Sequence, residues 1–514
     1  MYKIRNIIIP INKQIDLFKA LSYKLNIPLD SIEDLEILRN SLDARTKNHL
    51  KYNLTLKANI FIELKLDNDV QIFKEPMPYL KVSKKISDDH PFIIGAGPAG
   101  LFAALSLAEK GFQPYIFDRG DCLEDRTKKV TDFWENGILD EESNVQFGEG
   151  GAGTFSDGKL TTRKSDFYTN QVTKYFIKFG ANEEISYDAL PHLGTDNIRK
   201  IVLNIRKYLE SKGCKFFWNH KLEDLEIGNE KISLVTINGE IHKPEIVILA
   251  IGNAARDTFK MLSSKIELES KPFAVGFRIE HYQDFLNETF YGNQTDFDIS
   301  GPAAYRLTAK ALNRGVYSFC MCPGGQIIAS SSEKNSIVTN GMSNSSRNGK
   351  FGNSAIVVSV NEKDYGSGIL AGVHFQRKIE QKCFNPKQPY FAPFQKAMDF
   401  MRSNQSKQKI KTSFKPGVVT SNLNSIYPSS ITNAIKTGLK VFDRRAKGFI
   451  DRGVFIAPET RTSSPVRILR NNVTFCSQAV TNIFPCGEGS GYAGGIMSSA
   501  ADGFKVGSIF EKMK

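Results

Sequence analysis

The stretch "PFIIGAGPAGLFAALSLAEKGFQPYIFDRG", residues 91–120, decides the fold class of this chain. It has the order of a short apolar strand, a glycine turn, an Ala/Leu-rich helix and a second strand. Gly95, Gly97 and Gly100 follow the G-x-G-x-x-G spacing, which allows a tight turn, a close approach of backbone to a pyrophosphate, and close packing of helix on strand. Asp118 ends the second strand, where a carboxylate would accept hydrogen bonds from ribose hydroxyls. The stretch therefore predicts a unit that binds a dinucleotide.

A second glycine run, "QFGEGGAGTFSDGKLTTR" at residues 146–163, raises the question of a second dinucleotide. It lacks the apolar strand before it and the Ala/Leu-rich helix after it that the first run has. We therefore predict a loop that wraps the same dinucleotide a second time, with its glycines near the middle of the cofactor. Lys159 or Arg163 would then face an anionic group of the cofactor or of a substrate.

A third glycine run, "PCGEGSGYAGGI" at residues 485–496, follows a short strand and opens a helix of small residues. A nucleotide domain that begins and ends with such runs suits FAD better than NAD, because residues distant in sequence must meet around its adenosine and flavin-ribityl halves. No further G-x-G-x-x-G followed by an acid stands in a βαβ frame, so we expect no dedicated NAD(P)H domain.

The predicted fold class is α/β: a Rossmann-like FAD/NAD(P)-binding domain with an inserted, mostly antiparallel β domain and a small N-terminal α/β domain. The inserted segment lacks βαβ rhythm and carries strand-like pieces such as "FAVGFRIE" and "SAIVVSV". The expected boundaries are 1–85 for the N-terminal domain, 91–255 for the first part of the FAD-binding domain, 256–420 for the mostly β substrate or cap domain, and 421–514 for the C-terminal part of the FAD-binding domain.

Within the N-terminal domain, the patterns predict alternating strands and helices. Residues 3–11 and 53–64 favour strands, and residues 14–27 carry apolar side chains at helical spacing. We also predict a helix over residues 31–50, capped by Ser31. The polar run at 81–91 is expected to be a linker.

The composition is that of a folded protein, with 41% hydrophobic and 24% charged residues among 514. We find no apolar run long enough for a membrane span and no secretory signal, and the seven scattered cysteines do not form a disulfide framework. A reducing, cytoplasmic setting is the expectation. The net charge is +13, and residues 402–447 carry ten Lys/Arg against Asp443 alone. This predicts a basic surface, for which a solvated face is favoured over a site for phosphates or nucleic acid.

Several motifs together resemble the bacterial family of largely uncharacterised FAD-dependent dehydrogenases, which have the glutathione-reductase-type FAD fold. The resemblance covers roughly residues 90–510. The stretches that carry it include "GAGPAGLFAALSLAEKG" (95–111), "VQFGEGGAGTFSDGKLTTR" (145–163), "PHLGTD" (191–196), "KPFAVGFRIEH" (271–281), "ETRTSSPVRILR" (459–470) and "PCGEGSGYAGGI" (485–496).

The resemblance implies FAD as the cofactor, with Glu488 beside the ribityl chain and the helix near Gly491 pointed at the flavin pyrimidine ring. Family members often have Gly-His-Ser where this chain has Gly252-Asn253-Ala254, so no role for that histidine carries over. No metal site is expected. The residues expected to contact FAD are Gly95, Gly97, Pro98, Ala99, Gly100, Asp118, Arg119, Arg126, Gly150, Gly151, Gly153, Lys159, Gly252, Arg461, Gly487, Glu488, Gly491, Ala493, Gly494, Gly495 and Ile496.

The candidate catalytic residues stay unassigned. Cys320 and Cys322 suggest redox or metal chemistry, but a strand there would place both thiols on one face as small buried apolar groups, which is the favoured interpretation. His192 and His281 are expected to be structural. Two arginines in "ETRTSSPVR" (459–467) match anion recognition, while pairing with the glutamate at 459 is the alternative.

The favoured function is a flavoenzyme, an oxidoreductase or dehydrogenase that moves a hydride between an unknown small organic substrate and flavin N5. NAD(P)H is a candidate transient donor, and no membrane partner is expected. One alternative is a flavin-dependent enzyme that modifies RNA; nucleic acid is a less favoured partner that the sequence leaves open. Another is a non-catalytic binding protein on a flavoprotein scaffold.

Overall fold

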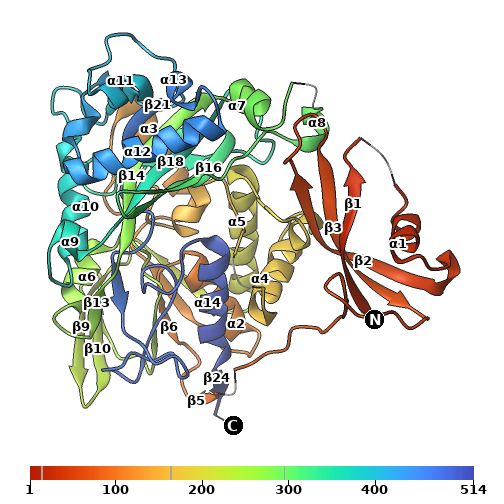
Figure 1. The fold of residues 1–514 in the computed structure, drawn as a ribbon. Helices are drawn as coiled ribbons and strands as arrows, with labels where there is room; N and C mark the ends of the chain where they lie inside the picture. Colours follow the sequence, from red (N-terminus) through yellow and green to blue (C-terminus); the bar gives the residue numbers. More distant parts are fainter. Residues whose placement is uncertain (13–14, 81, 163–164, 294–295, 514) are drawn as a thin grey trace.

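The computed structural model describes all residues except 13–14, 81, 163–164, 294–295 and 514. The chain is mixed α/β. Figure 1 shows a small sheet set to one side, a group of long helices beside a parallel sheet, and a large sheet on the remaining side. Among the described residues, no helix combines the length and apolar character needed to cross a membrane.

The N-terminal sheet has four antiparallel strands in the order β2-β3-β1-β4. Alternate residues of β3 are buried, as the predicted strand pattern requires. One helix packs beside it, and its N-cap Asp16 accepts hydrogen bonds from two backbone amides. The elements are β1 (Tyr2–Pro10), α1 (Leu17–Leu25), η1 (Leu29–Ser31), β2 (Ile32–Asp43), β3 (Lys51–Ile60) and β4 (Val70–Ile72).

The helix predicted over residues 31–50 is wrong, because most of this segment is the long strand β2. Ser31 caps no helix: its hydroxyl donates to the carbonyl of Pro28. Ile37 lies opposite Leu56 of β3, and Leu35 and Ile37 pack against the core of this domain. Tertiary pairing with a neighbouring strand thus overrides an apolar spacing that also fits a helix.

The second sheet is parallel throughout and has the order β23-β12-β6-β7-β8. The first glycine run joins β6 to the helix α2, and the chain then returns to the neighbouring strand β7, as the sequence predicted. The elements are β6 (Phe92–Ile94), α2 (Pro98–Ala108), β7 (Tyr115–Asp118), β8 (Lys215–Trp218), β12 (Val247–Leu249), β23 (Ile483–Pro485) and α14 (Ile496–Ser508).

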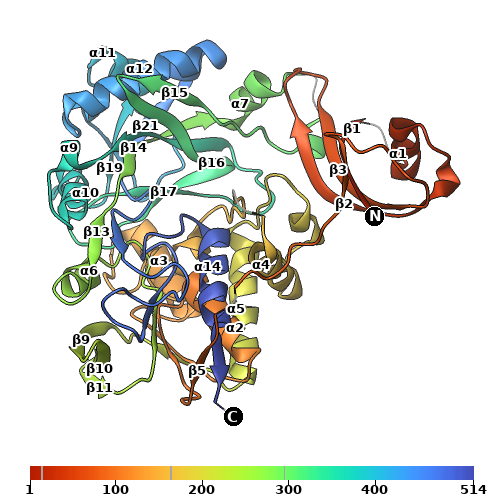
Figure 2. The same ribbon diagram turned by 60° about the horizontal axis from the view of Figure 1, so that its bottom comes forward.

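Helices α2 and α14 lie side by side (Figures 1 and 2). Gly503 of α14 packs so closely that a Cβ there would come within 1.9 Å of the Ala99 carbonyl oxygen of α2. Just beyond α14, β24 (Phe510–Lys512) pairs in parallel with β5 (Lys84–Ile86). The run predicted as a linker therefore contains a strand that holds the end of the chain.

The third sheet has eight strands, seven of them in the order β15-β16-β18-β14-β21-β19-β20, with β17 paired to β16. Its pairs are antiparallel except β19 with β20. Strand β21 lies beyond the boundary predicted at residue 420, so we propose that this domain extends past it. The elements are β14 (Phe273–Tyr282), β15 (Thr308–Ala311), β16 (Arg314–Ala329), β17 (Thr339–Met342), β18 (Phe351–Val360), β19 (Ala392–Lys396), β20 (Val418–Thr420) and β21 (Val454–Glu459).

Two small sheets and the remaining helices complete the described part of the chain. The strands β9, β10 and β11 form an antiparallel meander, and β13 pairs with β22. These strands are β9 (Leu222–Gly228), β10 (Lys231–Ile237), β11 (Glu240–His242), β13 (Leu268–Ser270) and β22 (Val466–Ile468). The helices are α3 (Leu123–Asn136), η2 (Gly151–Phe155), α4 (Phe167–Lys178), η3 (Glu183–Ser186), α5 (Thr195–Ser211), α6 (Arg256–Leu262), α7 (Gln283–Phe290), α8 (Phe297–Ser300), α9 (Glu362–Tyr365), α10 (Ala371–Lys382), α11 (Ala397–Arg402), η4 (Leu423–Ser425), α12 (Ser429–Arg445) and α13 (Phe449–Arg452).

Candidate cofactor and substrate cleft

A cleft of about 1870 Å³ is lined by residues of both the parallel sheet and the eight-stranded sheet. On one side are the carboxyl ends of β6, β7 and β12, the second glycine run and the start of α14; on the other are parts of β16 and β21. Ligands of open α/β sheets bind outside the carboxyl ends of the strands. Since small-molecule sites usually measure ~300–1,000 Å³, this cleft has room for a dinucleotide and a further ligand.

The three glycines of the first run have different surroundings. Gly95 has φ +107°, and a Cβ there would lie 2.3 Å from the Ala250 carbonyl oxygen. A Cβ at Gly100 would lie 1.8 Å from the Gly95 carbonyl oxygen, whereas one at Gly97 would meet only the Gly151 Cα, at 3.7 Å. The first and third glycines are therefore required by packing, and Gly97 leaves an open backbone face at the start of α2.

Asp118 joins the first two glycine runs through backbone amides. One carboxylate oxygen accepts from the Ala96 amide at 2.8 Å, and the other accepts from the amides of Gly120 and Gly148, both at 2.9 Å. A carboxylate has about four acceptor positions, and three are used here. Asp118 lines the cleft, but it also holds the two loops together, a role that the sequence did not indicate.

The second glycine run lies directly against the first. The Gly150 amide donates to the Ala96 carbonyl at 2.9 Å, and a Cβ at Gly151 would lie 3.1 Å from the Gly97 Cα. Gly153 lies beside Ile496 at the start of α14. The two runs therefore form adjoining walls of one cleft, and the wrapping of one cofactor by both runs stays a prediction.

Arg126, one of the predicted FAD contacts, is not among the residues that line the cleft. Its side chain is fully buried, and it donates to backbone carbonyls of the second run, including those of Asn144 at 2.8 Å and Gly151 at 2.9 Å. Burial lowers the pKa of Arg126 to about 9. Arg126 therefore shapes the loop from behind and does not reach the cleft.

The third glycine run brings Glu488 to the cleft beside an asparagine. Asn253 Nδ2 donates to Glu488 Oε1 at 2.7 Å, so this asparagine positions the carboxyl group. Burial raises the pKa of Glu488 to about 7. Gly494 and Gly495, just before α14, leave open space where a Cβ would lie. This end of the cleft therefore offers an open backbone face at a helix N-terminus.

Most of the predicted contact residues line the cleft, and four lie behind its wall. A Cβ at Gly150 would lie 2.1 Å from Thr154 Oγ1, so this glycine packs against its own loop. Arg163 lies outside the described residues. The lining residues are Gly95, Gly97, Pro98, Ala99, Asp118, Arg119, Gly151, Gly153, Lys159, Gly252, Arg461, Glu488, Gly491, Ala493, Gly494, Gly495 and Ile496. Those behind the wall are Gly100, Arg126, Gly150 and Gly487.

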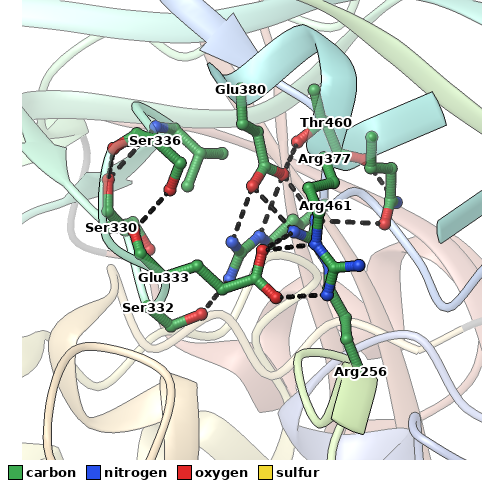
Figure 3. Close-up of polar contacts among 12 residues, drawn as sticks. Arg256, Ser330, Ser332, Glu333, Ser336, Arg377, Glu380, Thr460 and Arg461 are labelled. Carbon is green, nitrogen blue, oxygen red and sulfur yellow. Dashed lines mark hydrogen bonds and ion pairs between the residues drawn. The ribbon is translucent and has the colours of Figure 1, made fainter. Parts of the chain in front are cut away.

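Arg461 belongs to a buried ion network at the side of the cleft (Figure 3). Its guanidinium lies 2.8 Å from one carboxylate oxygen of Glu380. The other oxygen of Glu380 contacts Arg256 at 2.6 Å. Glu333 pairs with Arg256 at 2.9 Å and with Arg377 at 2.7 Å. The partner of Arg461 is therefore Glu380, not the glutamate at 459 that the sequence offered as an alternative.

The other arginine of that motif does not line the cleft. Arg467 pairs with Glu269 at 2.6 Å. His192 and His281 also lie off the cleft lining: their Nε2 atoms contact the backbone carbonyls of Ser345 and Phe449. A structural role for both histidines stays a prediction.

Lys159 faces two thiols as well as the cleft. Its ammonium lies 3.3 Å from Cys322 Sγ, 3.7 Å from Cys320 Sγ and 3.0 Å from Asp157 Oδ2. Cys320 lines the cleft and Cys322 is buried behind it. The two thiols face one lysine, as a shared strand face predicts, but their surroundings are charged and not apolar.

Sequence reasoning missed the buried charge next to these thiols. Arg278 is fully buried in β14 and pairs with Glu459 of β21 at 2.5 Å. Arg278 and Glu280 interrupt the otherwise apolar "FAVGFRIEH" at 273–281. Since charged side chains are almost never fully buried without a partner, this interruption is the signal that could have located the cluster.

Comparison with known families gives two matches. Residues 272–462 match the family described as FAD-dependent protein, C-terminal domain-like, and residues 1–59 match a domain of unknown function, DUF8436. The first match describes an FAD-dependent protein, and the cleft has open backbone at glycines such as Gly97 where a dinucleotide can approach. FAD is the cofactor of this protein. The matched range also includes β21.

An uncharacterized protein of Clostridium beijerinckii is 39% identical over 528 aligned residues, covering 99% of this chain and 98% of that protein. Among solved structures, CtdE in complex with FAD and substrate 4 is 11% identical, with a TM-score of 0.35 over 82% of this chain and 79% of CtdE. Glycine oxidase from Bacillus cereus is 11% identical, with a TM-score of 0.33 over 82% of this chain and 94% of the oxidase. These structural likenesses are too low to assign a shared activity.

Proposed function

This chain belongs to the same protein family as the Clostridium beijerinckii protein, and we propose that it is a flavin-dependent oxidoreductase acting on a small organic substrate. The observation that carries the proposal is the convergence of three glycine runs on one cleft whose opposite wall comes from a separate sheet. Such a cleft can hold a cofactor on one side and a substrate against its other wall.

The first two runs are suited to the ADP half of FAD. The open face at Gly97 lies at the start of α2, where backbone amides and the helix dipole attract a pyrophosphate. The remaining acceptor capacity of Asp118 is available to a ribose hydroxyl. Arg119 lines the same part of the cleft and pairs with Asp257 at 2.9 Å, which fixes its guanidinium.

The third run is suited to the flavin half. Gly494 and Gly495 give a close approach to the N-terminus of α14, whose dipole stabilises negative charge on a neighbouring ring. Glu488, held by Asn253, would accept hydrogen bonds from the ribityl hydroxyls. When bound, FAD supplies hydride acceptance and donation at its N5 atom. The opposite wall, which includes Tyr317 of β16, would orient the substrate.

The test is an anaerobic screen of small organic metabolites against the purified holoprotein. We expect the released cofactor to be FAD and at least one compound to bleach the flavin absorbance, with NADH and NADPH included as candidate transient donors. Reoxidation with an added acceptor should then give turnover. A holoprotein whose flavin is bleached by dithionite but by no metabolite or nicotinamide would contradict the proposal.

A second candidate function, RNA modification by the same cofactor, rests on the basic segment at 402–447. Nine of its ten Lys/Arg residues are exposed, and Lys436 is partly exposed. Salt-sensitive tRNA binding that is lost on charge reversal at Lys409, Lys411, Arg444 and Arg445 would support this candidate. Binding that is indifferent to these changes would remove its basis.

A further inference from the structure

The thiol pair lies in a cluster whose residues come from four separate segments. Lys159 comes from the second glycine run, Arg278 from β14, and Cys320 and Cys322 from β16. Arg278 Nη2 donates to the Cys320 carbonyl at 2.6 Å and lies 3.5 Å from Cys322 Sγ. Glu459 of β21 pairs with this arginine. Lys159 therefore contacts both thiols, while Arg278 contacts the Cys322 thiol and the backbone of Cys320.

Carboxylates compensate the cations of the cluster only in part. Asp157 contacts both Lys159, at 3.0 Å, and Arg347, at 2.5 Å, while Glu459 is the carboxylate paired with Arg278. Glu280 of β14 is a further buried carboxyl group that interacts with Arg278. Burial raises the pKa of Glu459 to about 7 and also raises the pKa of Glu280, which weakens both negative charges. Buried charges require compensation, which a thiolate within the cluster would supply.

The backbone conformation at Cys320 makes its side chain the more exposed of the two cysteines. Cys320 has φ +47° at an irregularity in the pairing of β16 with β18, between Phe319 and Cys322. Its side chain is partly exposed and lines the cleft, whereas Cys322 is fully buried and donates to the Cys320 carbonyl at 3.3 Å. A hydrogen bond from Cys322, followed by the charges of Lys159 and Arg278, lowers the pKa of Cys320. The same hydrogen bond and burial raise the pKa of Cys322.

We propose that Cys320 is a nucleophilic thiolate site in the cleft, held by Lys159 and Arg278, that bonds covalently to soft electrophilic carbon such as that of a conjugated carbonyl compound. In that step the sulfur electron pair forms the S–C bond, the carbon–carbon π bond breaks, and a proton from water adds at the α-carbon. No oxidant or reductant is consumed. The site is therefore independent of the proposed hydride transfer.

The experiment is the pH dependence of iodoacetamide alkylation of the holoprotein, followed peptide by peptide with mass spectrometry. Sulfur displaces iodide in this reaction, so its rate follows the thiolate fraction. We expect Cys320 to react with an apparent pKa below about 7.5, the range of thiolates beside cationic groups. Cys122, which is also partly exposed and whose pKa is raised by burial, serves as the internal reference.

Lys159→Met tests the cation, with Lys271→Met as the matched control at another lysine of the cleft lining. We expect alkylation of Cys320 at neutral pH to fall about tenfold in the first variant, the effect of one pKa unit, and to be unchanged in the second. If the bound cofactor keeps iodoacetamide from Cys320, the pKa of Cys320 is measured instead from the ultraviolet absorbance of the thiolate, as the difference between the wild type and Cys320→Ser. Flavin content and circular dichroism confirm folding. A Cys320 that titrates like Cys122, or a Lys159→Met variant that titrates like the wild type, would overturn the proposal.

Discussion

Gly97 and Gly100 are three residues apart in one motif, but the structure gives them separate roles. A side chain at Gly100 collides with the backbone of Gly95, whereas one at Gly97 points to open space beside Gly151. Substitution at Gly97 therefore separates cofactor binding from folding, which substitution of the other glycines of the motif cannot do.

We expect Gly97→Val to weaken FAD binding by about 1–3 kcal/mol, up to ~100-fold in affinity, because the side chain would occupy the space proposed for the pyrophosphate. FAD retained through gel filtration measures this, and circular dichroism checks the fold. Gly228→Val, at an open position of the β9–β10 hairpin, is the matched control. Undiminished FAD retention in the Gly97 variant would exclude the assigned role.

Glu149 gives a pH dependence at the residue scale. It is fully buried, accepts from the Leu123 amide at 2.7 Å, and burial raises its pKa from 4.5 to about 7. The folded state therefore binds this proton at a higher pH than the unfolded state. The resulting stability is complete below about pH 4.5 and is lost as the pH rises to about 7.

We expect Glu149→Gln to flatten the fall in stability between about pH 5 and 7, a difference of at most ~3 kcal/mol, since glutamine keeps the acceptor and does not ionise. Urea unfolding at several pH values measures it. Glu124→Gln removes the other carboxylate that pairs with Arg206 and is the control. It should retain the wild-type slope in this range, because the pKa of Glu124 is lowered. Equal slopes in the wild type and Glu149→Gln would refute the assignment.

At the scale of elements, the contact between α2 and α14 positions both helix N-termini at the cleft. The two helices can approach only because small residues face each other, with Gly503 against the backbone of Ala99. The N-terminus of each helix is next to a glycine run, so a displacement here would move both ends of the site.

We expect Gly503→Ala to destabilise the protein by about 1–3 kcal/mol and to reduce FAD retention, because the added methyl group forces the helices apart. Ser508→Ala, at the end of the same helix, should change neither quantity. Urea unfolding with flavin fluorescence follows both. Wild-type stability of the glycine variant would show that the helices accommodate a side chain at this contact.

At the scale of the whole molecule, the buried ion network joins segments that are far apart in the sequence. Arg256 begins α6, Glu380 lies in α10, and Arg461 follows β21 (Figure 3). The network thus ties α6 and α10 to the segment that follows β21. Its stability contribution depends on complete charge compensation.

We expect Glu380→Gln to destabilise the protein by about 3–5 kcal/mol, because it leaves Arg256 and Arg461 buried without their shared carboxylate. Glu333→Gln, at a partly exposed position of the same network, should have a smaller effect. Denaturant unfolding of both variants measures the difference. Equal effects would contradict the dependence on burial.

The sequence by itself determined the features that depend on local backbone chemistry. The first glycine run predicted its strand, turn and helix, because glycine freedom and apolar spacing act over a few neighbouring residues. The sequence did not predict contacts between distant segments. The segment of β2 is a strand because it pairs with β3. Arg461 pairs with Glu380 and not with the glutamate two residues away. Likewise, only the tertiary structure brings Lys159 and Arg278 to Cys320. The physical reason is that burial and charge compensation are set by the groups that surround a side chain in space.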